Sequence, residues 1–249
     1  MRVPIMRSVV QRRLLINYRL DPDLAAAIVP APFEPQLVNG HAVAGVCLIR
    51  LAQLRPRGVP AVFGATSESA AHRFAVQWRE GSELRTGVYI PERHSASLAN
   101  VAAGGRLFPG VHAHADFRVS ETATDITVAF AARDARCQVD AAVAISRELT
   151  DSKLFAGTEA ASEFFRTSPA GYSPNRRAAR LDGVELQTRA WSIEPAVIHH
   201  VRSSMFDDRE RFPAGSIHLD SALVMRNVPA DWHGIGSIVR AEMSSAAST

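Results

Sequence analysis

Short runs of strand-forming residues, separated by turn signals, recur along the chain and constrain its fold more than any other feature. Residues 70–79 alternate, with Arg73 on one face and Phe74 and Trp78 on the other. Asn39-Gly40 is a hairpin turn signal between two such runs. The pattern predicts an α+β fold, mainly antiparallel β, whose sheet closes on itself or packs as two sheets. The predicted strands are 12–20, 33–37, 42–54, 70–79, 84–90, 111–119, 125–132, 137–145, 178–181 and 184–192.

A few short accessory helices accompany these strands. Asp21-Pro22-Asp23 predicts a capped helix start, and the helix covers 24–29. Further helices are predicted at 95–103 and 158–166. Proline and glycine predict the ends of strands and the turns between them. Pro91 ends the predicted strand 84–90, residues 171–175 are predicted to form a turn, and Asp182-Gly183 is predicted to form a hairpin turn. Residues 195–205 fit either a strand or a loop.

Size and composition indicate one folded domain spanning 1–249, with frayed ends at 1–9 and 241–249. The chain is 47% hydrophobic and 21% charged, which excludes disorder, collagen-like repeats and coiled coil as whole-chain descriptions. No apolar run approaches the roughly 20 residues of a membrane helix. No secretory signal follows the basic N-terminus, so a cytoplasmic protein without a membrane segment is expected.

The charged residues and cysteines favour no macromolecular partner and no metal. The net charge is +3, and the short arginine clusters, such as Arg12-Arg13, are read as solvated surface, so nucleic-acid binding is not expected. Cys47 and Cys137 lie far apart in apolar contexts, which indicates buried thiols and too few ligands for a metal site. Lys153 is the only lysine, so one side-chain amine is available for Schiff-base chemistry.

Several motifs, in order, resemble the acetoacetate decarboxylase-like superfamily, and most of all its uncharacterised YqjF-like branch. The similarity starts with a strand, a short helix and the segment Val29-Pro30-Ala31-Pro32-Phe33-Glu34, followed by a long apolar strand. It continues through the loop 54–60, the segment 87–90 and Arg106-Leu107-Phe108-Pro109-Gly110. A weaker match runs from Gly171 to Trp191, so the resemblance covers residues 10 to 195.

The resemblance implies a β-barrel or cone with an internal cavity, often in a homo-oligomer. The family decarboxylase uses a Schiff-base lysine beside a second lysine, and both would fall within 92–105, where this chain has no lysine. The acidic residues of the family's core strand are also absent from 42–47. The resemblance therefore argues against acetoacetate decarboxylation by the Schiff-base route, and a fold does not fix a function.

Two clusters offer acid–base and carboxylate-binding chemistry. Glu92 and His94 follow Pro91 and are candidate catalytic residues at a cavity mouth; alternatively, they belong to a polar loop that caps the next helix. Arg73, with Glu68 as a partner, is a candidate to bind a carboxylate or enolate. The alternative is that Arg73 lies on an exposed face while Phe74 and Trp78 fill the core.

Other polar residues extend the candidate site. Arg106 and Tyr172 are further substrate-binding candidates, although a buried tyrosine more often only packs. His112, His114 and Asp116 would share one strand face and resemble half of a metal site, yet a solvent-facing strand has the same pattern. Lys153, near Phe155, is either a desolvated nucleophile or a surface lysine.

These observations support two functions. The first is a lyase- or isomerase-like enzyme that acts on an organic acid or keto compound without a Schiff base, metal or cofactor. The second is a non-catalytic small-molecule-binding protein on the same scaffold; an oligomeric interaction module without a cavity is a third, weaker alternative. Convergent arginine, glutamate and histidine in a cavity would favour the enzyme, and an apolar lining would favour the binding protein.

Overall fold

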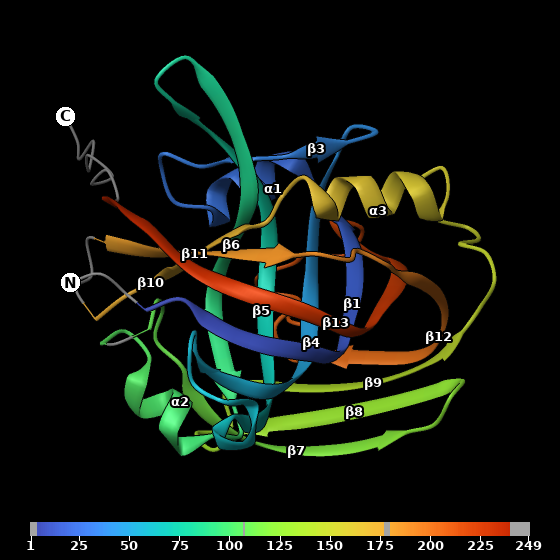
Figure 1. Ribbon diagram of the computed structural model, residues 1–249. Helices are drawn as coiled ribbons and strands as arrows, with labels where there is room; N and C mark the ends of the chain where they lie inside the picture. The colour runs from blue at the N-terminus through green and yellow to red at the C-terminus, as the bar shows by residue number, and fades with distance from the viewer. Residues whose placement is uncertain (1–3, 107, 177–179, 240–249) are drawn as a thin grey trace.

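The computed structural model describes residues 4–106, 108–176 and 180–239, and β-strands make up most of it (Figure 1). The helices are α1 (Pro22–Ile28), α2 (Leu98–Ala103), α3 (Thr158–Arg166) and the 3₁₀ turn η1 (Ala61–Phe63). The strands are β1 (Met6–Leu20), β2 (Glu34–Pro35), β3 (Leu37–Val38), β4 (His41–Pro56), β5 (Ala65–Glu80), β6 (Glu83–Ser95), β7 (Ala113–Glu121), β8 (Asp125–Ala132), β9 (Gln138–Ile145), β10 (Ala170–Pro174), β11 (Arg180–Thr188), β12 (Glu194–Ser203) and β13 (Ile217–Val239). The predicted α+β class, mainly antiparallel β, is confirmed.

Local signals in the sequence account for several element boundaries. The Asp21 carboxylate accepts hydrogen bonds from the backbone N–H groups of Asp23 and Leu24, both at 3.0 Å, and so caps α1. Asn39 and Gly40 have φ values of 49° and 79°, which the hairpin turn between β3 and β4 requires. Helix α3 has the predicted bounds. None of the helices in the described ranges has the length and apolarity that a membrane crossing requires.

The sheet closes on itself in two rings that share five strands. β13, β1, β4, β5 and β6 lie side by side in this order. On one side β6 leads through β7, β8, β9 and β12 back to β13, and on the other it leads through β10 and β11 back to β13. The shared strands, seen near the centre of Figure 1, therefore have two covered faces.

Alternation along the shared strands produces two separate buried clusters. One face carries Leu14, Val46 and Phe74, which belong to the larger hydrophobic cluster together with β7, β8 and β9. The other face carries Leu15 and Cys47, which pack beneath α3. Trp78 lies with Phe74 in the larger cluster, so Arg73 is directed to the opposite face.

The structure corrects four expectations. Pairing begins at Met6, so 6–9 are not frayed, whereas 241–249 lie outside the described residues. Strand β6 continues through Pro91, because the β5–β6 register shifts there and proline's missing N–H breaks no ladder bond. The predicted turn at 171–175 lies largely within β10, and Asp182-Gly183 lies inside β11, which pairs with both β10 and β13. Of the predicted strand 178–181, positions 178 and 179 lie outside the described residues.

Candidate functional site

A cavity of about 650 Å³ lies on the α3 side of the shared strands. Strands β1, β4, β5 and β6 form its floor, and β10, β11 and α3 contribute its walls. A volume of this size is typical of small-molecule sites. Its lining includes Arg13, Cys47, Ile49, Ala71, Arg73, Val88, Ile90, Arg93, His94, His112, Phe165, Ser168, Gly171, Glu185 and Trp191.

Three arginines, on strands β1, β5 and β6, define the chemistry of this cavity. Arg73 on β5 donates from Nη2 to Asn17 Oδ1, and its guanidinium lies 4.7 Å from the centre of the Phe165 ring. Arg93 on β6 donates from Nε to Ser173 Oγ at 2.6 Å. Arg13 lies on β1.

Several donors of these arginines are buried without a partner among the described residues. They are Nε of Arg13, Nε and Nη1 of Arg73, and Nη2 of Arg93. No ion pair within the described ranges joins any of the three to a carboxylate, and the lining carboxylate Glu185 accepts from Gln187. Buried donors normally have partners, so these atoms are available to a molecule that supplies acceptors.

Glycines make room for the guanidinium groups. Gly45 lies opposite Arg73 in the β4–β5 ladder, and a Cβ atom there would lie 3.2 Å from Arg73 Nη2 and would overlap the Ile16 carbonyl oxygen. A Cβ atom on Gly110, where φ is 81°, would lie 3.0 Å from Arg93 Nε. A glycine inside a strand is a signal of such close approach, and Gly45 carries that signal in the sequence.

Burial perturbs the titratable groups around the cavity. Burial, together with the nearby charge of Arg13, lowers the pKa of Arg73 to about 10. Burial also lowers the pKa of Arg93 to about 10. His112 accordingly has a pKa of about 4, because it is buried and lies beside Arg93. At neutral pH the cavity therefore holds charged guanidinium groups beside a neutral imidazole.

The two candidate catalytic residues do not lie together in this cavity. His94 is part of its lining, but its buried ring packs 5.2 Å from that of Phe130 in the larger cluster, and burial lowers its pKa. Glu92 is exposed, is not part of the lining, and lies near His72 and Cys137.

The candidate substrate-binding residues separate in the same way. Arg73 lines the cavity and is buried, although Phe74 and Trp78 also lie in the core, so both expected faces of β5 are covered. Glu68 does not pair with Arg73, because it lies on the opposite face and forms ion pairs with Arg12 and Arg50.

Two further candidates lie outside the cavity. Arg106 is exposed and donates to the Ala102 carbonyl oxygen at 3.1 Å. Tyr172 packs between Phe33 and Trp78, with ring centres 5.3 Å apart in each pair. A role for Glu68, Arg106 and Tyr172 in substrate binding stays a prediction that this cavity does not support.

The predicted histidine row does not converge on one point. His112 precedes β7 and faces the Gly110 carbonyl oxygen at 3.2 Å, whereas the exposed Asp116 lies 3.7 Å from Arg133. Lys153 is exposed and outside the lining, and its backbone N–H donates to Asp220 at 2.8 Å.

Sequence reasoning missed the participation of Arg13. The Arg12-Arg13 pair was expected to be solvated, but Arg12 is fully buried and Arg13 faces the cavity. Their position inside a long strand-forming run was the available signal, because both faces of a shared strand are covered.

Comparison with solved structures shows the acetoacetate decarboxylase-like fold. Acetoacetate decarboxylase from Legionella pneumophila is similar with a TM-score of 0.62 and 12% identity, covering 94% of this chain and 88% of that one. An acetoacetate decarboxylase-like enzyme from Sphingomonas wittichii RW1 has a TM-score of 0.62 and 15% identity, covering 97% and 94%. The enduracididine biosynthesis enzyme MppR, complexed with the condensation product of pyruvate and imidazole 4-carboxaldehyde, has a TM-score of 0.62 and 15% identity, covering 98% and 92%. At these identities the likeness establishes the fold alone.

Comparison at the sequence level establishes the family. No curated protein matches the chain. The profile of DUF2071, described as an uncharacterized conserved protein, matches residues 8–224, which include the strands of the cavity floor except the first two residues of β1. The chain therefore belongs to the DUF2071 family.

Proposed function

We propose that the chain is a small-molecule enzyme that binds the carboxylate of an organic acid or keto acid in the arginine cavity. The observation that carries the proposal is the set of buried guanidinium donors on Arg73 and Arg93 that lack partners among the described residues. Carboxylates match guanidinium donors with short, charge-assisted hydrogen bonds. MppR, which shares the fold, was solved in complex with pyruvate, and this supports the keto-acid class.

The reaction that suits this lining is lyase- or isomerase-like. Arg73 and Arg93 would hold the carboxylate and stabilise negative charge that develops on an adjacent carbonyl oxygen. His112, neutral because its pKa is lowered, would accept or return a proton at the neighbouring carbon. His94 is a more remote candidate, because its ring packs against Phe130 in the larger cluster. No lysine lines the described cavity, so the route uses no Schiff base. Glu92 is a second candidate for proton transfer, but it lies outside the cavity lining.

The alternative is a non-catalytic binding protein on the same scaffold. A specific observation favours it: burial holds the pKa of His112 at about 4, which makes its imidazole a weak base at neutral pH. Such a protein would bind the acid and return it unchanged.

One experiment distinguishes the two. Pyruvate, acetoacetate and malonate are titrated into the protein by calorimetry, and pyruvate is followed by proton NMR in D₂O for loss of its methyl signal. Saturable binding with hydrogen exchange supports the enzyme, and saturable binding without exchange or turnover of any of the three supports the binding protein.

The variant pair Arg93→Gln and Arg85→Gln tests the site itself. Arg93→Gln should weaken binding about tenfold or more, since a charged hydrogen bond is lost. Arg85, an exposed residue of the β5–β6 hairpin paired with Glu80 and Glu83, serves as the matched control and should leave binding unchanged. If none of the three acids binds, or if Arg93→Gln binds as tightly as the wild type, the cavity is not the site.

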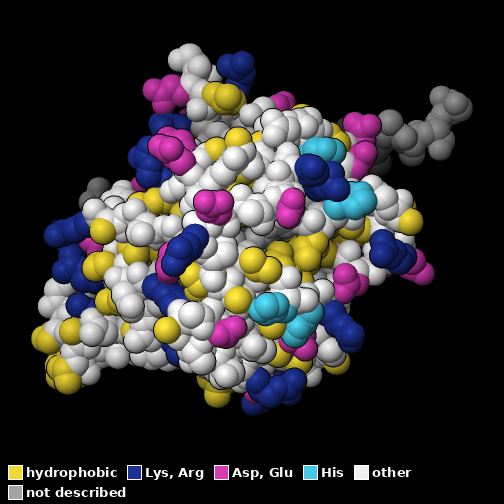
Figure 2. Space-filling model, turned by 90° about the vertical axis from the view of Figure 1, so that its right-hand side faces the viewer, with side chains coloured by type: hydrophobic (Ala, Val, Ile, Leu, Met, Phe, Trp, Pro, Cys, Tyr) yellow, Lys and Arg dark blue, Asp and Glu magenta, His cyan; other side chains and the backbone are white. Residues whose placement is uncertain are grey.

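The proposal also includes a cytoplasmic homo-oligomer with no nucleic-acid partner. Val62 and Phe63 on η1 are 83% and 75% exposed, and such apolar exposure supports a subunit contact there. Basic and acidic side chains are interspersed on the face in Figure 2, which does not favour a nucleic-acid surface. Light scattering on the wild type and on Phe63→Ser tests the contact, and an unchanged mass would refute it.

A further inference from the structure

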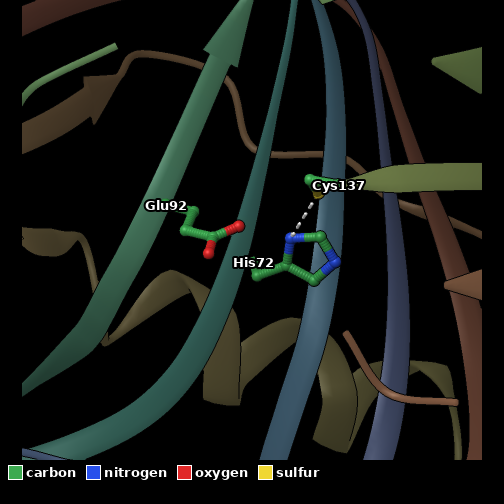
Figure 3. A group of neighbouring side chains, drawn as sticks. All are labelled: His72, Glu92 and Cys137. Atoms are coloured by element: carbon green, nitrogen blue, oxygen red, sulfur yellow. Dashed lines mark hydrogen bonds between the residues drawn. The ribbon is translucent and has the colours of Figure 1, made fainter. Parts of the chain in front are cut away.

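A cluster of three potential metal ligands lies on the face of the shared strands opposite the arginine cavity. His72 on β5, Glu92 on β6 and Cys137 just before β9 each offer one ligand atom, and these atoms lie within 4.8 Å of one another. It is the one such group among the described residues. Figure 3 shows the three side chains directed toward a common point between the strands.

The His72 ring is fixed so that one nitrogen faces the other two ligands. Nε2 lies 3.0 Å from Ser203 Oγ, while Nδ1 lies 3.9 Å from Cys137 Sγ. The ring also packs edge-on against Phe206, with centres 5.4 Å apart. If Nε2–H donates to Ser203, Nδ1 presents its lone pair toward the cluster. Ser203 then orients the ring as the hydrogen-bond partner of a metal-binding histidine does.

Burial differs between the three ligands in a way that suits a bound cation. His72 is fully buried and Cys137 is 2% exposed, so imidazole and thiol are held in place. Glu92 is exposed, so its carboxylate provides access from solvent and has freedom to close on an ion.

We propose that His72 Nδ1, Cys137 Sγ and the Glu92 carboxylate bind one divalent cation of the zinc type. Imidazole, thiolate and carboxylate are the ligands that Zn²⁺ takes, and three protein ligands leave the fourth tetrahedral position for water. Nitrogen and sulfur ligands of a tetrahedral Zn²⁺ lie about 3.5 Å apart, close to the 3.9 Å seen here. Binding forms the metal–sulfur bond and releases the thiol proton to solvent, with no change of oxidation state.

The site is independent of the arginine cavity. His72 and Arg73 are neighbours on β5, and so are Glu92 and Arg93 on β6, yet each pair is divided between the two faces. Failure of the acid-binding proposal would therefore leave the metal proposal standing, and the reverse also holds.

Cobalt provides the test. Chelator-treated, reduced full-length protein is titrated with Co²⁺ and, separately, with Zn²⁺. The expected result is one ion per chain, with a near-ultraviolet thiolate-to-cobalt charge-transfer band and visible bands of tetrahedral intensity. Zn²⁺ should then remove both sets of bands. A Co²⁺ spectrum without a thiolate band would overturn the proposal on the wild type alone.

Matched variants assign the ligands. Cys137→Ser should abolish the thiolate band, whereas Cys47→Ser, at the other free thiol, should keep it. Glu92→Gln changes an exposed side chain and should weaken Zn²⁺ binding at least about tenfold, because losing a hydrogen-bond partner of a metal ligand alone costs that much, whereas the exposed Glu83→Gln should not. A thiolate band that persists in folded Cys137→Ser would refute the ligand assignment, and so would an unchanged Zn²⁺ affinity in Glu92→Gln. If Cys137→Ser does not fold, the Zn²⁺ affinity of Glu92→Gln decides the question.

Discussion

Replacing Arg73 with methionine should cost the ligand-free protein less stability than the loss of a buried core side chain usually does, while removing acid binding. Arg73 is 2% exposed and no carboxylate pairs with it among the described residues. Its pKa of about 10, lowered first by burial, corresponds to about 3 kcal/mol of destabilisation from keeping the charge, at about 1.4 kcal/mol per pKa unit. The guanidinium is charged in both folded and unfolded states at pH 7, so this cost is present throughout the neutral range and is relieved only above pH 10.

The contacts that Arg73 makes offset part of that cost. Methionine leaves Asn17 Oδ1 without its donor, which costs about 1 to 3 kcal/mol. Loss of the cation–π contact with Phe165 costs up to about 2 kcal/mol. The side-chain volume is largely kept, so little cavity is created. The balance is a change in unfolding free energy between a gain of about 2 and a loss of about 2 kcal/mol, instead of the larger loss typical of a buried side chain in the core.

Urea denaturation with and without pyruvate measures both effects. At a pyruvate concentration of about 100 times Kd the wild type should gain about 2.7 kcal/mol, and Arg73→Met should gain nothing. The exposed Arg85→Met is the control, with a change within about 0.5 kcal/mol and full ligand stabilisation. A loss of more than about 3 kcal/mol without ligand, together with an undiminished pyruvate effect, would show that Arg73 stabilises the fold and does not bind the acid.

Three further predictions follow from the same contacts. Glu68→Gln leaves buried Arg12 with only Glu121 and should cost about 3 kcal/mol in urea, whereas the exposed Glu163→Gln should cost less than about 1; equal losses would contradict this account. Gly45→Ala should cost about 2 kcal/mol or more because its Cβ overlaps the Ile16 carbonyl oxygen, whereas Gly236→Ala meets open space; a stable Gly45→Ala protein would mean that β4 shifts freely. His112, with a pKa of about 4, stays neutral in the folded state while the unfolded chain takes up a proton below pH 6.5, so His112 alone should lower stability by about 2 kcal/mol between pH 7.5 and 5. His112→Gln should lose less stability over that pH interval, and an unchanged slope of the urea midpoint against pH would refute the assignment.

The regular elements could be predicted because their signals are local. Helix α3 and strand β8 have the predicted bounds, since caps, alternation and turn residues lie within a few positions of each element. The path of β6 through Pro91 could not be predicted from local signals. It depends on a register shift against β5, which only the paired strands reveal.

The site was predicted in part for the same reason. Alternation placed Arg73 opposite Phe74, but it does not tell which face is covered, and here both are. The contribution of Arg13 depends on α3, β10 and β11, which cover the second face from distant parts of the chain. The juxtaposition of His72 with Cys137 spans 65 residues and leaves no spacing motif in the sequence.

The protein contains two kinds of buried arginine, and the difference between them distinguishes a role in folding from a role in function. Arg12 is fully buried, but Glu68 and Glu121 compensate its charge, so it belongs to the structure of the larger ring. Arg73 and Arg93, on the other face of the shared strands, have buried donors without partners and no carboxylate to compensate their charge among the described residues. Apolar side chains of similar volume would serve folding as well or better at such positions. The positive charges of Arg73 and Arg93 therefore lie where they do not stabilise the ligand-free protein. What these charges can stabilise is a bound anion.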